Sequence, residues 1–214
     1  MNTITKLLAI TVVALIIVTG TEAYIIQTSN TQIVRIACVG DSLTRGTEYT
    51  LFLWEQLSPK YIISDFGVGG TTASRASEKP YMNQSAFQLA LDFQPSIVII
   101  MLGTNDAGIE QTSEAFTSDY VKIITAFQNL NTKPDVFIVQ PPPIYDTTAL
   151  SNNALVGKII PGIQAAAQQT GTTLIDANTP LLNHVEYFYD GIHPDADGAR
   201  IIADTIYAKL QPTL

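Results

Sequence analysis

Cysteine, histidine and basic residues are all scarce in this chain of 214 residues. With Cys38 as its one cysteine, it cannot form a disulfide within the chain. Its two histidines, His184 and His193, do not cluster with Cys38, so we expect no metal site of the usual nitrogen and sulfur ligands. The 11 lysines and arginines form no run, and 19 acidic residues bring the net charge to −8. We therefore do not expect nucleic acid or anionic membrane surfaces as partners, because both require clustered positive charge.

The first apolar run lies at the N-terminus and is short. Leu7–Val18 is almost entirely apolar, follows Lys6, and precedes Thr21-Glu22-Ala23, which fits a cleavage site with small residues. This layout is typical of a secretory signal peptide, whereas a membrane-spanning helix needs roughly 17–25 apolar residues. We interpret residues 1–23 as a signal peptide or an N-terminal membrane anchor. A buried helix of the domain is the third alternative.

The first two interpretations both predict export, so we expect a secreted or extracytoplasmic protein that contacts a membrane only through this possible anchor. Residues 24–32 are polar and indicate a linker, and residues 33–214 indicate a single domain. The hydrophobic content of 46% is sufficient for a packed core. The oligomeric state stays open.

Apolar strands and amphipathic helices alternate along residues 33–214. The predicted strands cover 33–39, 61–66, 97–102, 136–139 and 172–175, and the predicted helices cover 49–57, 83–93, 113–130, 150–170 and 195–210. Pro161 predicts a kink or a split in the fourth helix. Unbroken apolar strands are typical of a parallel sheet with helices on both faces. We predict an α/β fold, a flavodoxin-like three-layer α/β/α sandwich with five parallel strands in the order 2-1-3-4-5.

Small polar residues follow the ends of the predicted strands. Gly40-Asp41-Ser42-Leu43 follows the first strand, residues 67–72 the second, Gly103-Thr104-Asn105-Asp106 the third, and Asp190-Gly191-Ile192-His193 lies beyond the fifth. In such sheets, ligands bind beyond the carboxyl ends of the strands. These segments therefore predict a functional site along one rim of the sheet.

The residues at this rim suit acyl transfer by a serine. A serine nucleophile needs a base within hydrogen-bond reach, and the base needs an orienting carboxylate. His193 follows Asp190 by three residues, and Gly191 favours a tight turn between them. Such a turn would bring the carboxylate of Asp190 to one ring nitrogen and leave the other for the proton of Ser42. Ser42, Asp190 and His193 are therefore the candidate catalytic residues.

The developing oxyanion would need hydrogen-bond donors placed in advance. We expect these to be the N–H groups of Ser42 and Gly70 and the side-chain amide of Asn105. Each residue also has a purely structural explanation, because serines cap helices and Asp, Asn and Gly are common in turns. His184 is the rival base, but it has no matching acid motif and is interpreted as a surface residue. Asp106 is predicted to orient the loop of Asn105.

These segments together resemble the sequence blocks of the SGNH/GDSL hydrolases. The four segments are Gly40-Asp41-Ser42-Leu43, Asp65-Phe66-Gly67-Val68-Gly69-Gly70, Gly103-Thr104-Asn105-Asp106 and Asp190-Gly191-Ile192-His193, in family order. The resemblance implies a flavodoxin-like fold and ester hydrolysis without a metal or other cofactor. It also implies the roles given above for Ser42, Asp190, His193, Gly70 and Asn105. Asp65 departs from the family pattern, which often has Asn at that place.

Two further segments bear on the substrate. Lys79-Pro80-Tyr81 and Gln140-Pro141-Pro142-Pro143 resemble family members that remove acetyl groups from carbohydrates, such as sialate or xylan acetylesterases. A small-molecule or polysaccharide ester is therefore the expected partner. One alternative is a lysophospholipase or thioesterase of the same family that acts on longer acyl chains. A second is a non-catalytic carbohydrate-binding module, and a receiver domain is disfavoured because residues 176–180 lack its lysine.

Overall fold

The structure is a computed structural model that describes residues 33–145 and 150–211. The predicted signal peptide or anchor (1–23) and linker (24–32) lie outside these residues. The helices and strands described below belong to the unit Val34–Leu214. Within the described ranges, no helix combines the length and the apolar character that a membrane span requires.

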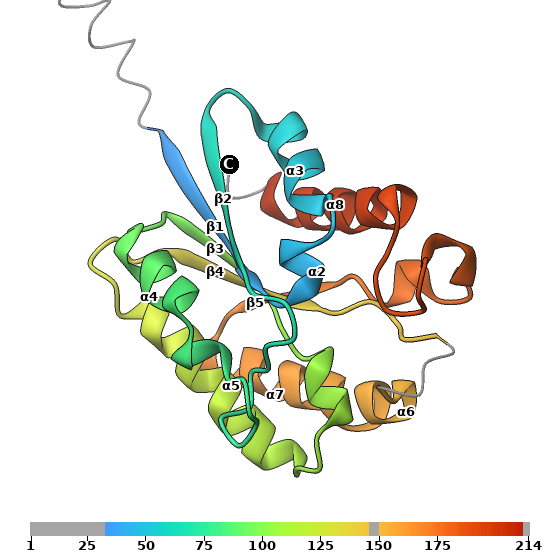
Figure 1. The fold of residues 1–214 in the computed structure, drawn as a ribbon. Helices are drawn as coiled ribbons and strands as arrows, with labels where there is room; N and C mark the ends of the chain where they lie inside the picture. The colour runs from blue at the N-terminus through green and yellow to red at the C-terminus, as the bar shows by residue number, and fades with distance from the viewer. Residues whose placement is uncertain (1–32, 146–149, 212–214) are drawn as a thin grey trace, which may run out of the picture. The chain divides into compact units, whose positions relative to one another are not determined.

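A parallel sheet forms the centre of this unit (Figure 1). Its described strands are β1 (Val34–Gly40), β2 (Tyr61–Gly67), β3 (Ile97–Met101), β4 (Asp135–Gln140) and β5 (Thr173–Asp176). They pair in parallel in the order β2-β1-β3-β4-β5. The predicted fold class and strand order are therefore confirmed, and each predicted strand overlaps an observed one to within two residues at its ends.

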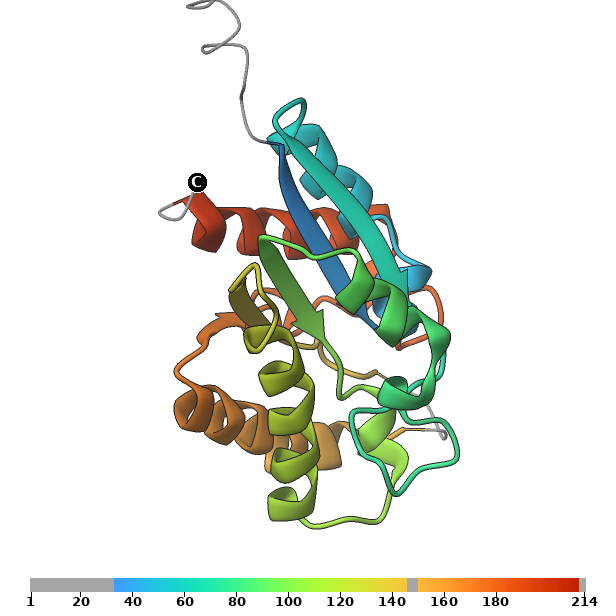
Figure 2. The ribbon, with the colours of Figure 1, turned by 90° about the vertical axis from the view of Figure 1, so that its left-hand side faces the viewer.

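Two layers of helices cover the two faces of the sheet (Figures 1 and 2). Helices α3 (Tyr49–Leu57) and α8 (Ala196–Leu210) pack on one face, and α4 (Ser85–Asp92), α5 (Ser113–Gln128) and α7 (Ile160–Thr170) pack on the other. Successive strand side chains point to opposite faces, so Ile36 and Cys38 join the first layer while Ala37 and Val39 join the second. All four are fully buried. Burying a large aliphatic side chain stabilises the fold by about 1.5–3 kcal/mol, so both layers hold the strand ends in place.

One helical segment was not predicted, and another shows the split that Pro161 predicted. A short helix, α2 (Ser42–Arg45), follows β1 directly and was not predicted from the sequence. The predicted helix over residues 150–170 is split into α6 (Asn152–Ala154), a π-helical turn at Leu155–Ile159, and α7. Pro161 lies in the first turn of α7, where a missing N–H leaves no hydrogen bond unmade. The split therefore falls just before the proline.

Candidate active site

The turn from β1 into α2 places Ser42. Asp41 caps the helix, and its Oδ1 accepts a hydrogen bond from the N–H of Leu43 at 2.9 Å. Gly40 makes the turn possible, because a Cβ there would lie 2.6 Å from the carbonyl oxygen of Met101. Ser42 is thus the first helical residue, and the capping role considered for it belongs to Asp41.

The turn of Asp190 to His193 forms the other half of the site. Oδ1 of Asp190 accepts hydrogen bonds from the N–H groups of Ile192 at 3.0 Å and His193 at 2.7 Å. Oδ2 of Asp190 lies 2.6 Å from Nδ1 of the His193 ring. Partial burial raises the pKa of Asp190, but these hydrogen bonds outweigh it and bring the pKa below its ordinary value. The carboxylate therefore stays ionised and fixes the orientation of the ring.

Gly191 fits this turn against the rest of the domain. Its φ of +79° lies in the left-handed region, which favours glycine. Its carbonyl oxygen accepts a hydrogen bond from the N–H of Tyr145 at 2.6 Å, just beyond β4. A Cβ on Gly191 would overlap the carbonyl oxygen of Tyr145. The close approach of these two backbones holds the turn at the carboxyl end of the sheet.

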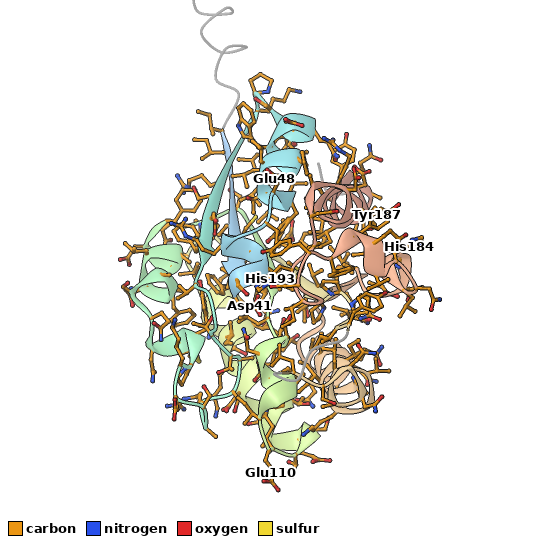
Figure 3. All side chains as sticks on the ribbon, turned by 45° about the vertical axis from the view of Figure 1, so that its right-hand side comes forward. Asp41, Glu48, Glu110, His184, Tyr187 and His193 are labelled. Carbon is orange, nitrogen blue, oxygen red and sulfur yellow. The ribbon has the colours of Figure 1, made fainter. Side chains whose placement is uncertain are left out.

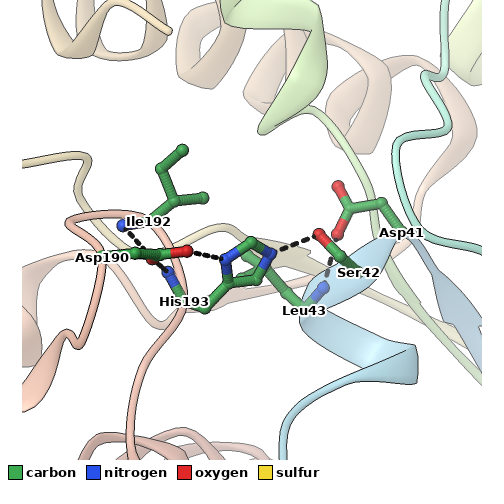
Figure 4. A network of polar contacts seen from close by, with 6 residues as sticks. All are labelled: Asp41, Ser42, Leu43, Asp190, Ile192 and His193. Atoms are coloured by element: carbon green, nitrogen blue, oxygen red, sulfur yellow. Dashed lines mark hydrogen bonds and ion pairs between the residues drawn. The ribbon is translucent and has the colours of Figure 1, made fainter. Parts of the chain in front are cut away.

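The two halves meet at a hydrogen bond between Ser42 and His193. Nε2 of His193 lies 2.8 Å from Oγ of Ser42, so the hydroxyl, the ring and the carboxylate of Asp190 form one continuous chain (Figure 4). With Nδ1 directed at the carboxylate, the consistent tautomer carries its proton on Nδ1. Nε2 is then free to accept the proton of the hydroxyl. The three residues come from both ends of the domain sequence, and the structure brings their side chains together.

The loop after β2 brings Gly70 to the same rim. Gly70 has a φ of +76°, and the adjacent Gly69 is so close to Ser42 that a Cβ on it would lie 3.7 Å from Cβ of Ser42. On its other side, this loop is bonded to Asn105, whose Nδ2 donates to the carbonyl oxygen of Thr71 at 2.9 Å. Asn105 begins the 3-10 turn Asn105–Gly108 after β3. Ser42, Gly70 and Asn105 therefore lie on adjoining segments at one rim.

Asp106 joins these two loops from inside the domain. Its carboxylate is buried and accepts hydrogen bonds from the N–H groups of Ala73 and Ser74, both at 2.9 Å. Burial raises the pKa of Asp106, although these two hydrogen bonds oppose the shift. Asp106 thus acts on the loop after β2, and it fixes that loop relative to the turn of Asn105.

A second buried carboxyl group lies next to Ser42 in the chain. Asp41 is fully buried, and its Oδ2 has no hydrogen-bond partner within the described residues. Burial raises the pKa of Asp41 to about 7; the hydrogen bond from Leu43 opposes the shift, and the nearby charge of Asp106 adds to it. This shift could not be predicted from sequence, because burial depends on the packed structure.

The aromatic residues before the turn have different positions. Phe188 is buried, whereas 68% of Tyr189 is exposed, and its ring stacks on His193 with centroids 5.8 Å apart and planes inclined by 13°. His184 lies apart from Asp41 and His193 (Figure 3). It bonds to Glu186 at 2.8 Å and stacks on Tyr187. His184 therefore does not compete with His193 as the base for Ser42.

In the described part of the chain, no three His, Cys, Asp or Glu side chains gather in a group able to bind a metal ion. The polar groups at the rim are instead arranged around Ser42. Together they provide a hydroxyl bonded to an imidazole and a carboxylate behind it, with Gly70 and Asn105 on two neighbouring loops. This arrangement is suited to acyl transfer.

Known proteins resemble this chain in sequence and in fold. The model of the GDSL-like lipase/acylhydrolase family matches residues 38–201. An acetylxylan esterase from Xylanibacter ruminicola is 30% identical over 207 residues, which cover 83% of this chain and 43% of that protein. The chain therefore spans less than half the length of this relative.

Two solved structures show the same fold. A lipase/acylhydrolase from Enterococcus faecalis superposes with a TM-score of 0.69 at 16% identity, covering 85% of this chain and 97% of that one. A carbohydrate acetylesterase from Sinorhizobium meliloti gives a TM-score of 0.65 at 20% identity, covering 85% of this chain and all of that one. With the family model extending over most of the domain and all four sequence blocks at one rim, the chain belongs to the GDSL-like lipase/acylhydrolase family.

Proposed function

We propose that this protein is a carboxylic ester hydrolase in which Ser42, His193 and Asp190 act as a catalytic triad. The observation that carries the proposal is the continuous chain of hydrogen bonds from Oγ of Ser42 through the His193 ring to Asp190. Membership of a family of lipases and acylhydrolases supports the same reaction class.

In the first half of the reaction, Nε2 of His193 takes the proton of Ser42 as Oγ attacks the acyl carbonyl carbon. The ring becomes an imidazolium, and the ionised Asp190 stabilises its charge from the Nδ1 side. His193 then returns the proton to the alkoxide of the departing alcohol. In the second half, a water molecule gives a proton to His193 and attacks the acyl-enzyme. His193 then returns this proton to Oγ of Ser42 as the acid is released.

The oxyanion of each tetrahedral intermediate would be bound by the N–H groups of Ser42 and Gly70 and by Nδ2 of Asn105. One hydrogen of this amide is directed to Thr71, which leaves the other for the oxyanion. Ser42 is the first residue of α2, where N–H groups have no partner within the helix. Donors held in place before the reaction stabilise the transition state without reorganising.

We further propose that the substrate is an acetylated carbohydrate, such as a polysaccharide ester, and that the protein acts outside the cytoplasm. The acetylxylan esterase relative, 30% identical in sequence, supports an acetyl group on a sugar. The signal-like residues 1–23 support export, where polysaccharides are accessible. A longer acyl chain is the competing substrate.

Hydrolysis by the full chain tests both the proposed triad and the proposed substrate. We expect turnover of p-nitrophenyl acetate and release of acetate from acetylated xylan, with slower turnover of p-nitrophenyl palmitate. The matched variant Ser42→Ala removes only the nucleophilic oxygen, and its activity should fall to the background rate. Full activity in this variant would refute the triad. Preference for palmitate would point to lipids, and sugar binding without hydrolysis of any ester would leave a carbohydrate-binding module.

A further inference from the structure

Lys79 forms a hydrogen bond with the loop that carries Gly70. Its Nζ donates to the carbonyl oxygen of Gly69 at 2.7 Å. The same ammonium group is the nearest atom to the open side of Gly70, since a Cβ placed there would lie 4.0 Å from Nζ. Lys79 has no part in the reaction described above, although it lies at the mouth of the site.

The carbonyl group that Lys79 binds belongs to the same peptide unit as the N–H of Gly70. A trans peptide is planar, so its C=O and N–H point in opposite directions and turn together. Both flanking residues are glycines, and glycine tolerates the dihedral changes that rotate such a unit. A half turn would point the carbonyl oxygen of Gly69 at the position where an oxyanion needs a donor.

The backbone of Lys79 is anchored independently of its side chain. Its carbonyl oxygen accepts a hydrogen bond from the N–H of Thr72 at 3.2 Å, and the N–H of Tyr81 returns one to Thr72 at 2.9 Å. The buried Tyr81 then reaches β2, where its hydroxyl group donates to the carbonyl oxygen of Phe66 at 2.7 Å. The ammonium group therefore binds the Gly69 carbonyl from a residue whose backbone is held in place by other hydrogen bonds.

We propose that Lys79 is a positioning residue that locks the Gly69–Gly70 peptide in the orientation presenting the N–H of Gly70 to the oxyanion. This inference rests on the proposed ester hydrolysis. A hydrogen bond from a charged donor is roughly twice as strong as one between neutral groups, so it opposes rotation of the peptide. It also polarises the peptide, which makes the N–H at the other end a better donor.

The variants Lys79→Met and Lys79→Arg test this role. Methionine keeps most of the apolar stem without the charge, and arginine keeps a charged donor. Loss of an oxyanion donor costs about 10²–10³ in turnover, and a donor that is only misoriented should cost on the order of tenfold. On p-nitrophenyl acetate we expect Lys79→Met to lower kcat by about tenfold with KM changed less than about twofold. Lys79→Arg should recover most of the lost turnover.

Lys60→Met serves as the matched control. Lys60 is exposed and precedes β2 at the end of the strand opposite Gly67, so its loss should leave kcat unchanged. A second readout is the rate of inactivation by diethyl p-nitrophenyl phosphate, whose phosphoryl oxygen occupies the place of the oxyanion. We expect Lys79→Met to slow this inactivation by a factor similar to the loss in kcat, with an unchanged melting temperature.

The outcomes separate this inference from the proposed function. An active wild type whose kcat is unchanged in Lys79→Met would overturn the positioning role alone. An increase in KM restricted to anionic esters would overturn it as well, because Lys79 would then bind the substrate directly. A wild-type chain that hydrolyses no ester would refute the proposed function and this role together.

Discussion

The side-chain amide of Asn105 donates a hydrogen bond to the carbonyl oxygen of Thr71 across 2.9 Å. This bond connects the loop after β3 to the loop after β2, which also carries Gly70. Two of the proposed oxyanion donors are therefore held to one another as well as to the sheet. The position of either donor depends on both loops.

Replacing Asn105 by alanine should lower kcat on p-nitrophenyl acetate by about 10²–10³, the usual cost of losing one oxyanion donor. The lost bond to Thr71 should lower the free energy of unfolding by only about 1 kcal/mol. Measuring kcat and urea denaturation on the same preparation separates the loss of turnover from the loss of stability. Asn105→Asp keeps the shape of the side chain but adds a negative charge, so its kcat should be no higher than that of Asn105→Ala. A loss of turnover below about threefold in Asn105→Ala would remove Asn105 from the oxyanion site.

Replacing Gly191 by alanine should disturb the turn that holds Asp190 and His193. The left-handed backbone alone costs about 1–2 kcal/mol for a residue with a Cβ, and overlap with the carbonyl oxygen of Tyr145 adds to this. We expect at least a tenfold loss of kcat and a lower melting temperature. Gly171→Ala is the control, because Gly171 also has a positive φ but has open space around it. Equal losses of kcat and melting temperature in the two variants would show that the contact of Gly191 with Tyr145 does not hold the turn.

The pH dependence of stability should report the buried carboxyl group of Asp41. Its pKa of about 7 in the folded protein exceeds the value of about 3.9 in an unfolded chain, so folding favours the protonated form. Its stabilising contribution is full below about pH 4 and is lost as the pH rises through 7. Asp41→Asn cannot titrate, so its free energy of unfolding relative to wild type should increase by roughly 2–4 kcal/mol between pH 4 and 8.

Urea denaturation of both proteins across this pH range measures the difference. The amide oxygen of the variant still accepts the hydrogen bond from Leu43, so the cap of α2 is retained. Asp106 has a raised pKa too, but it is present in both proteins and largely cancels in the difference. Parallel stability curves for Asp41→Asn and wild type would show that folding does not raise the pKa of Asp41.

The ring of Tyr189 should assist His193 when the imidazole becomes a cation. An aromatic face within about 6 Å of a cation at an exposed site is worth about 0.5–1 kcal/mol, which corresponds to a two- to fivefold change in rate. Tyr189→Leu should lower kcat by this factor, whereas Tyr189→Phe should not. Tyr187→Leu is the matched control, because Tyr187 stacks on the other histidine, His184. A similar loss in both leucine variants would indicate a general effect on packing.

The sheet and the four rim segments were predictable because each has a local signal. The strands are short apolar runs, and Asp190 and His193 are three residues apart on one turn. Helix α2 was not predicted, because its four residues show no helical periodicity and depend on the Asp41 cap. The split before α7 was placed only approximately, since Pro161 marks the first turn of a helix as readily as a kink.

Contacts between segments that are distant in the sequence could not be predicted from local sequence patterns. The bond of Lys79 to Gly69 spans a surface loop, and the stack of Tyr189 on His193 depends on side-chain rotation. The burial of Asp41 and its effect on ionisation likewise arise only when the layers pack. Local patterns thus indicated which residues meet at the rim, and packing determined how each is oriented and charged.

Ser42 and His193, the proposed nucleophile and base, are separated by 151 positions along the chain. During synthesis, Ser42 emerges from the ribosome early, and the base follows only when the last helix is about to be made. Under the proposed mechanism, partly made chains therefore lack a complete triad, and so do molecules in which the turn of residues 190–193 and α8 have locally detached. We therefore expect the proposed hydrolysis to report native docking at the C-terminal end, and to be lost before global unfolding under mild denaturation.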